Sequence, residues 1–153
     1  MKTRTFTIIK PNAVAAGNMG KILDMILADG FEIRAMKMVF FSRNDAAKFY
    51  AVHKGRPFFG ELLEFMTSGA VVVAILERED AVAALRKLVG ATDPAKAEDG
   101  TIRRLFANSL TKNAIHASDS AENVQVEWSQ FFAASELMDA DDEPVLESGV
   151  YAK

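Results

Sequence analysis

The chain has 153 residues, half of them hydrophobic and a quarter charged, which suits one folded domain and excludes a disordered chain. It contains no cysteine, which excludes disulfides and thiolate metal sites. No apolar run reaches the roughly 18 residues of a membrane span and the N-terminus lacks a signal-peptide core, so we expect a soluble, cytoplasmic protein.

The formal net charge is −3, but the two parts of the chain differ in sign. Residues 1–112 carry 17 Lys/Arg against 12 Asp/Glu, whereas residues 113–153 carry nine acidic residues and one lysine. A basic body fits a phosphate-bearing partner, although surface charge that serves only solubility is the alternative. The pI of about 5.4 argues against a dedicated DNA-binding protein. We expect one domain over residues 1–138, with residues 139–153 as its acidic C-terminal extension.

The first half of the chain alternates strand and helix patterns. Residues 4–10 predict a strand that Pro11 ends. Apolar residues at three- and four-residue spacing predict a helix over Met19–Ala28, and β-branched and aromatic residues predict a second strand over 31–41. Ser42 or Asn44 is a candidate cap for a helix that runs through residue 53.

The second half continues the alternation. Pro57 predicts the start of a helix over 58–66, and the apolar run 70–76 predicts a buried strand. A helix is expected over 80–89, followed by a loop over 91–114 that contains one helical turn at 101–106, and then a short strand at 115–117. Asp119 and Glu122 predict a capping pair that opens a long last helix. This order predicts an α+β sandwich.

Residues 113–120 read Asn-Ala-Ile-His-Ala-Ser-Asp-Ser and contain His116, one of only two histidines. A neutral imidazole is a good nucleophile at physiological pH. Glu127 falls on an apolar helix stripe formed by Val124, Trp128 and Phe131. A carboxylate on a buried face needs a partner, and His116 is the candidate. Spacing alone leaves open the alternative that His116 is an ordinary histidine and that Glu127 lies at the edge of the stripe.

The chain contains no usual nucleotide-binding loop. The segment Gly17–Lys21 has the wrong glycine spacing for a P-loop, and Ile22 stands where Ser or Thr would be needed. A bound nucleotide would therefore have to be held by side chains.

The 113–120 segment resembles the active-site signature of the nucleoside diphosphate kinases, Asn-x-x-His-Gly-Ser-Asp-Ser. The resemblance is to the bacterial type of the family and covers about residues 4–138. Its further matches lie in the family's order at residues 7–14 (Thr-Ile-Ile-Lys-Pro-Asn-Ala-Val), 56–59 (Arg-Pro-Phe-Phe), 66–69 (Met-Thr-Ser-Gly), 90–95 (Gly-Ala-Thr-Asp-Pro-Ala) and 100–103 (Gly-Thr-Ile-Arg). The resemblance implies a ferredoxin-like β-α-β-β-α-β fold with a four-stranded antiparallel sheet.

The resemblance also implies a function, nucleoside-diphosphate kinase. The terminal phosphoryl group of ATP would pass to a nucleoside diphosphate by ping-pong transfer through a phosphohistidine on His116. It implies Mg²⁺, held mainly by the nucleotide phosphates and not by a set of protein ligands. The expected partners are nucleoside tri- and diphosphates and further copies of the chain, as a tetramer or a hexamer. No membrane or dedicated nucleic-acid binding is expected.

The resemblance assigns roles to twelve residues. The expected catalytic set is His116, Glu127, Lys10, Tyr50 and Ser118. The expected nucleotide-binding set is Lys10, Phe58, Leu62, Arg86, Thr92, Arg103, Leu110 and Asn113. Taken singly, each has an ordinary structural explanation: a lone helix-face arginine is usually solvated, and a phenylalanine is usually part of the core. His53 is read as a surface residue without a role.

Ala117 departs from the family pattern, because the family has glycine after the histidine. The added methyl group beside the nucleophile is expected to lower activity slightly. Two alternatives to the enzyme follow: a catalytically weakened relative that binds nucleotides as a sensor or interaction module, and a single-strand nucleic-acid binder. The second alternative needs exposed aromatic residues interleaved with basic ones, and the sequence has no such stretch.

Overall fold

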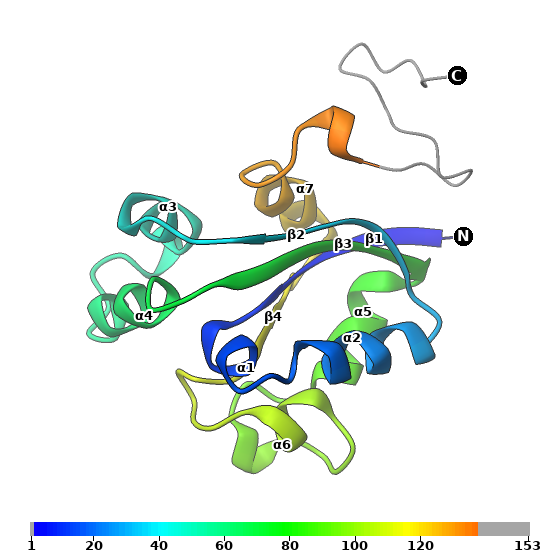
Figure 1. The fold of residues 1–153 in the computed structure, drawn as a ribbon, viewed down its shortest axis with the longest axis horizontal. Coiled ribbons are helices and arrows are strands. Elements are labelled where there is room, and N and C mark those ends of the chain that lie inside the picture. The colour runs from blue at the N-terminus through cyan, green and yellow to red at the C-terminus, as the bar shows by residue number, and fades with distance from the viewer. Residues whose placement is uncertain (1, 138–153) are drawn as a thin grey trace.

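The computed structural model describes residues 2–137, which form a four-stranded antiparallel sheet with helices on both faces (Figure 1). The order of strands across the sheet is β2-β3-β1-β4. The predicted acidic extension 139–153 lies outside the described residues. The strands are β1 (Lys2–Ile9), β2 (Glu32–Val39), β3 (Val71–Glu79) and β4 (Ile115–Ala117).

The helices divide between the two faces of this sheet, with α2, α5 and α6 below it and α7 above it in Figure 1. No helix within residues 2–137 is long and apolar enough to cross a membrane. The α-helices are α1 (Pro11–Ala15), α2 (Met19–Ala28), α3 (Arg43–Phe49), α4 (Phe59–Met66), α5 (Ala81–Val89), α6 (Ile102–Phe106) and α7 (Ala121–Trp128). Three 3₁₀ turns complete them: η1 (Ala51–His53), η2 (Pro94–Lys96) and η3 (Ala134–Glu136).

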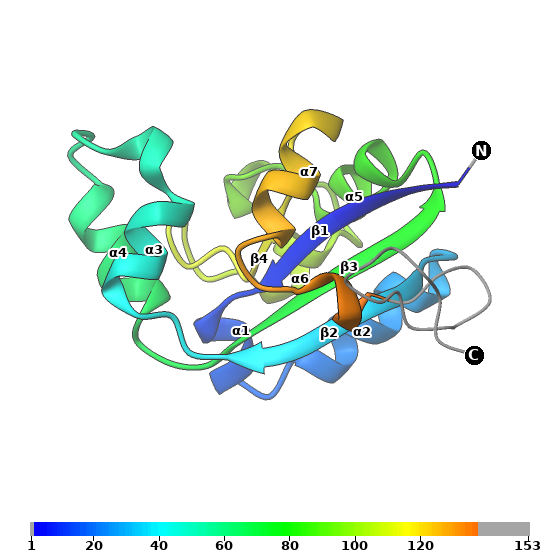
Figure 2. The ribbon, with the colours of Figure 1, turned by 90° about the horizontal axis from the view of Figure 1, so that it is seen from above.

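The core of the fold is the succession β1-α2-β2-β3-α5-β4, so the predicted ferredoxin-like β-α-β-β-α-β class is confirmed. The chain adds α3 and α4 at one end of the sheet and α7 over β1, as Figure 2 shows. These additions create the corner in which the candidate site lies.

The sheet separates two apolar layers because its side chains alternate between the faces. Phe6 and Ile8 of β1 pack in the layer with α3, α4 and α7, whereas Ile9 packs in the layer with α2 and α5. The strand β3 supplies apolar residues to both layers, since Val73 lies in one and Val72 in the other. Its continuous apolar run therefore marks a central strand covered on both faces, as predicted.

The strongest sequence patterns gave the correct bounds. The helix Met19–Ala28 and the strand Ile115–Ala117 are confirmed as predicted. The strand predicted to stop at residue 76 continues to Glu79, because its charged end pairs with the charged start of β1, Lys2 lying opposite Glu79. Pairing with a neighbouring strand thus extends β3 beyond its apolar signal.

Two local predictions need correction near the first half of the chain. Pro11 does end β1, but it also begins α1, where its missing N–H costs no hydrogen bond. The predicted helix from Ser42 to residue 53 divides into α3 and η1 after Phe49. Ser42 is its N-cap, and its hydroxyl accepts the Asp45 N–H at 3.0 Å.

The predicted capping pair of the last helix is wrong. The N-cap of α7 is Ser120, whose side chain makes no capping hydrogen bond. The Asp119 carboxylate accepts instead from the side-chain amide of Asn123 at 2.8 Å. The helix is also shorter than predicted, because it ends at Trp128, and Phe131 packs against the core from the segment that follows.

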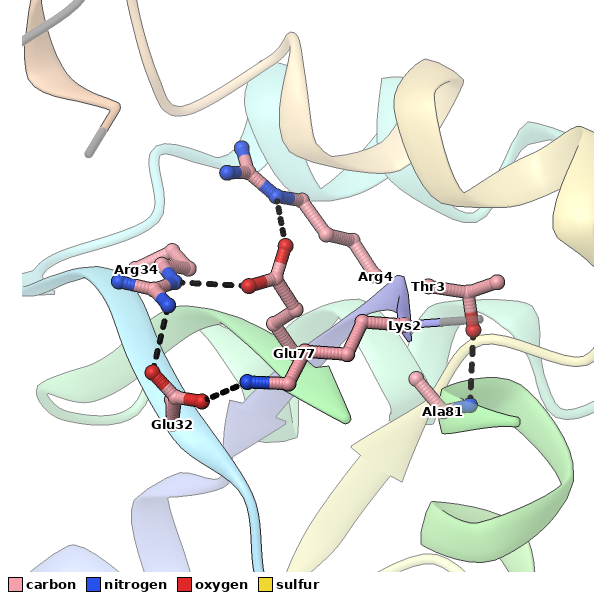
Figure 3. A network of polar contacts seen from close by, with 7 residues as sticks. All are labelled: Lys2, Thr3, Arg4, Glu32, Arg34, Glu77 and Ala81. Atoms are coloured by element: carbon pink, nitrogen blue, oxygen red, sulfur yellow. Dashed lines mark hydrogen bonds and ion pairs between the residues drawn. The ribbon is translucent and has the colours of Figure 1, made fainter. Parts of the chain in front are cut away.

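A network of charged side chains ties β1, β2 and β3 together near the N-terminus (Figure 3). The Arg34 side chain, only 2% exposed, donates to Glu77 at 3.0 Å and to Glu32 at 2.5 Å. Glu77 also accepts from Arg4 at 3.0 Å, and Lys2 pairs with Glu32. Since each of the three strands contributes a charge, the network fixes their register at this end of the sheet.

We expect Glu77→Gln to lower the free energy of unfolding by about 3 kcal/mol, because the buried Arg34 loses the more buried of its two carboxylate partners. Urea denaturation measures the change. Glu32→Gln is the matched control, since its side chain is 45% exposed and water screens its ion pairs, so its loss should be much smaller. Equal losses in the two variants would contradict the burial argument.

Candidate active site

A pocket of about 610 Å³ opens at the corner between α7, the α3–α4 end of the sheet and the loop that precedes β4. Its size is that of a typical small-ligand site. Every site residue predicted from the sequence lines it except Ser118, which lies directly behind it. The structure therefore brings together residues that span positions 10 to 127 of the chain.

His116 occupies the middle of β4, where the strand pairing places it beside Ile8 of β1. Its carbonyl accepts from the Thr7 hydroxyl at 2.7 Å, which fixes the backbone beneath the ring. The ring nitrogen Nε2 lies 3.0 and 3.2 Å from the two carboxylate oxygens of Glu127 on α7. An ionised carboxylate can only accept, so Nε2 carries a proton, and in the neutral ring Nδ1 is then the nitrogen with the lone pair.

Ser118 supports this pair from behind. Its hydroxyl donates to Oε1 of Glu127 at 2.5 Å, and its amide donates to the Phe6 carbonyl at 3.1 Å. Because Ser118 is fully buried, the carboxylate is held between a fixed donor and the imidazole. Glu127 therefore has little freedom to leave His116.

Tyr50 lies at the inner wall of the pocket, at the C-terminal end of α3. Its hydroxyl is buried and has no hydrogen-bond partner among the described residues. Burial raises the pKa of Tyr50, and the negative charge of Glu127 raises it further, so the phenol stays protonated. A buried donor without a partner is available to a ligand that enters the pocket.

Three cations line the same pocket. Lys10 follows β1, Arg103 lies on α6 and Arg86 lies in the last turn of α5. Burial lowers the pKa of Lys10 to about 7, and the charge of Arg103 adds to the effect. Burial likewise lowers the pKa of Arg103 to about 10, with a contribution from Arg86. Burial disfavours the charged forms of these side chains, and a bound polyanion would favour them. The pocket is therefore suited to a ligand with several negative charges.

Two backbone carbonyls hold Arg103 in place. Its guanidinium donates to the Gly90 carbonyl at 3.0 Å and to the Ile115 carbonyl at 2.9 Å. Gly90 has φ +89°, and a Cβ there would lie 2.6 Å from the Thr101 hydroxyl oxygen, so only glycine fits. The Nε atom of Arg103 is buried without a partner among the described residues. The arginine is thus positioned before any ligand binds.

A tight turn precedes β4 and places Asn113 in the pocket wall. Ala114 has a left-handed backbone, φ 73°, and the Ile115 N–H donates to the Asn113 carbonyl at 2.9 Å across it. This is the pattern of a γ-turn with positive φ, which is strained for alanine. The Lys10 N–H holds the turn by donating to the Ala114 carbonyl at 2.8 Å.

The mouth of the pocket is apolar. Phe58, 44% exposed, and Leu110, 61% exposed, lie on its lining, and Leu62 is buried behind them. Exposed large apolar side chains at a pocket mouth mark a surface for a flat apolar ligand. Thr92 lines the pocket and is itself exposed.

The pocket contains residues that the sequence did not predict. His53, read as a surface residue without a role, lies on its lining with its ring 5.2 Å from that of Phe58. Phe49, Val52, Asp119 and Asn123 also line it. Asp119 belongs to the 113–120 motif, which could have indicated it. No motif or periodicity distinguishes the other four residues, because they reach the pocket only through the packing of α3, η1 and α7.

Ala117, the departure from the family pattern, lies in β4 opposite Thr7. The backbone of Ala117 is not left-handed, so this position does not need the conformational freedom of glycine. Its methyl group is nearly buried in the lower apolar layer. The predicted small loss of activity stays a prediction.

Residues 3–137 match the family model described as nucleoside diphosphate kinase. A nucleoside diphosphate kinase of a Nitratiruptor species is 56% identical over 135 residues, which cover 88% of this chain and 98% of that protein. The crystal structure of the Aquifex aeolicus enzyme has a TM-score of 0.87 at 46% identity and covers 90% of this chain and all of that one. The Halobacterium salinarum enzyme, solved in complex with CDP, has a TM-score of 0.87 at 36% identity over 91% of this chain and 93% of its own.

Proposed function

The chain belongs to the nucleoside diphosphate kinase family, and we propose that the pocket around His116 is where its phosphoryl transfer takes place. The protein is a nucleotide-binding transferase of nucleotide metabolism that converts ATP and a nucleoside diphosphate to ADP and a nucleoside triphosphate. It becomes a phosphoprotein during each cycle, since the phosphoryl group is carried on His116. The observation that carries the assignment of the site is the Glu127–His116 contact inside a pocket with three cations.

In the first half-reaction the Nδ1 lone pair of His116 attacks the terminal phosphorus of the triphosphate. The bond from this phosphorus to the bridging oxygen breaks, and the diphosphate leaves with the electron pair. The ring becomes a cation when its nitrogen is phosphorylated, and the Glu127 carboxylate stabilises that charge through Nε2–H. The second half-reaction reverses these steps with another diphosphate.

The cations stabilise the negative charge that spreads over the phosphoryl oxygens. We assign Arg86, Arg103 and Lys10 to these oxygens, with the Thr92 hydroxyl and the buried Tyr50 hydroxyl as further donors. Arg103 supports this assignment most directly, because two carbonyls fix it and no reorganisation is needed at the moment of transfer.

We propose that Mg²⁺ is held mainly by the nucleotide phosphates, where it neutralises part of their charge when it is bound. Residues 2–137 contain no group of three or more His, Cys, Asp or Glu side chains that could hold a metal ion. In this proposal the metal arrives with the nucleotide.

The nucleoside would lie along the apolar mouth. Phe58 and Leu110 are assigned to the two faces of the base, with Leu62 behind them. Such apolar walls contact the face of any base, which suits a site that accepts several nucleotides. Asn113 and Lys10 are assigned to the ribose hydroxyls, and the unpartnered Oδ1 of Asn113 supports this role.

The cellular setting is also proposed. We place the protein in the cytoplasm, with nucleoside di- and triphosphates as its partners. Helices cover both faces of the described sheet, so it offers no open strand surface on which single-stranded bases could stack.

The decisive experiment incubates the purified chain with γ-labelled ATP and Mg²⁺. We expect an acid-labile label on the wild-type protein and none on His116→Ala, whereas a weakened relative that only binds nucleotides would take up no label. Glu127→Gln should retain the labelling site but slow its formation by about 100-fold, because the ring loses its charged support. A label that persists in His116→Ala would place the nucleophile elsewhere.

Binding of ADP should depend on the charge of Lys10. With a pKa of about 7, the free protein carries this charge below pH 7 and loses it as the pH rises through 7. The ratio of wild-type to Lys10→Met affinity should therefore fall by about tenfold between pH 6 and pH 8. Titration calorimetry measures both affinities, and the ionisation of ADP cancels in their ratio. A ratio that stays flat would show that Lys10 keeps its charge.

We propose that the chain forms a homo-oligomer, tetramer or hexamer, through β2. This strand is an edge of the described sheet, and Met36 and Met38 expose about half of their surface there. Phe40, just beyond its end, is 76% exposed. An open edge with an apolar flank is a template for the same strand of a second copy in antiparallel pairing.

Light scattering after gel filtration tests the assembly. The wild type should run as an oligomer, and Met38→Lys should shift it toward smaller species, because the charge would be buried in the contact. Val126→Lys, at a position on α7 that is 70% exposed and away from the strand edge, is the control. A monomeric wild type, or an equal shift in both variants, would contradict the β2 contact.

A further inference from the structure

Phe49 is the last residue of α3, and its ring lies beside the imidazole of His116. The ring centroids of Phe49 and His116 are 5.2 Å apart, and the two planes are nearly perpendicular at 82°. Phe49 also lines the pocket. The second aromatic neighbour of the imidazole, Phe6, is farther away at 6.4 Å.

The contact with Glu127 does not fix the imidazole completely. That contact holds one atom of the ring, Nε2, while rotation about the Cβ–Cγ bond of a histidine has broad energy wells. The hydrogen bond opposes a half-turn of the ring, because a half-turn would leave the carbon Cε1 facing Glu127. It does not oppose a smaller twist about Cβ–Cγ, because the carboxylate can accept from Nε2 over a range of ring planes. Such a twist would turn the Nδ1 lone pair away from the line of attack on the phosphorus, so the reaction needs something that fixes the plane.

Phe49 is itself held too firmly to move with the imidazole. Its ring packs against those of four other aromatic residues, with centroid separations from 4.9 to 6.1 Å, namely Phe6, Phe41, Tyr50 and Phe131. Three of these belong to the apolar layer above the sheet as buried residues. These contacts hold the Phe49 ring in one position.

We propose that Phe49 is a positioning residue that fixes the plane of the His116 imidazole, so that Nδ1 stays directed into the pocket. The proposal rests on the function of His116 as the phosphoryl carrier and adds a second constraint to the one that Glu127 supplies. Phe49 touches neither the phosphate nor the proton, and it acts only through the ring that it faces.

The test compares Phe49→Leu with Phe41→Leu in the full chain. Phe41 belongs to the same aromatic cluster, and the only aromatic rings paired with it are those of Phe49 and Phe131 within residues 2–137. In single-turnover labelling with γ-labelled ATP, Phe49→Leu should phosphorylate His116 about tenfold more slowly, with the affinity for ADP changed less than about twofold. Phe41→Leu should keep the wild-type rate even where it lowers the melting temperature.

NMR relaxation of the His116 ring supplies a readout that a purely structural role would not move. Because Glu127 accepts from Nε2 in both proteins, the tautomer should stay the same, whereas the order parameters of the ring C–H bonds should be lower in Phe49→Leu than in the wild type. If Phe49→Leu does not fold, Phe49→Met keeps most of the volume without a flat ring and carries the same expectation. A folded variant with the wild-type rate and wild-type order parameters of the ring overturns the proposal, as does an equal loss of rate in Phe41→Leu. A wild type that takes up no label on His116 would instead refute the function itself.

Discussion

The hydrogen bond between His116 and Glu127 is the contact on which the proposed phosphoryl transfer depends. It joins the shortest strand of the sheet to the helix that lies over it, so its length of 3.0 Å reflects the packing of β4, β1 and α7 together. Thr7 holds the backbone of His116 from one side, and Ser118 holds the carboxylate from the other. Buried Val124, one turn before Glu127, keeps α7 on the sheet. The fold therefore determines which nitrogen of His116 carries the proton and where the other nitrogen points.

The chain has no glycine-rich loop for phosphate binding, and its pocket contains basic side chains instead. Arg103 and Lys10 are nearly buried, and the loss of solvation lowers the pKa of both. Backbone carbonyls compensate Arg103 in part, whereas the Lys10 amide holds the strained turn at Ala114. A phosphate chain would supply the missing partners. Binding energy is thus available for the transfer, because the protein has already ordered the groups that make the contacts.

The sequence predicted this fold well where the signal was local and repeated. The apolar period of Met19–Ala28 and the bounded run Ile115–Ala117 gave correct elements, and spacing alone made Glu127 the candidate partner of His116. The remaining site residues came from the resemblance to a family, because each alone looks like an ordinary surface or core residue. The helix begun by Pro11 was missed, since proline was read only as the end of a strand. The contact of Phe49 could not be predicted, because it joins residues 67 positions apart through tertiary packing alone.

The pocket walls come from almost every part of the chain, from Lys10 after the first strand to Glu127 on the last α-helix. The pocket is complete only when the last α-helix lies on the sheet, because that helix carries Glu127. A fragment that ends before this helix would lack one wall of the pocket, so turnover would report on whether the whole domain is folded.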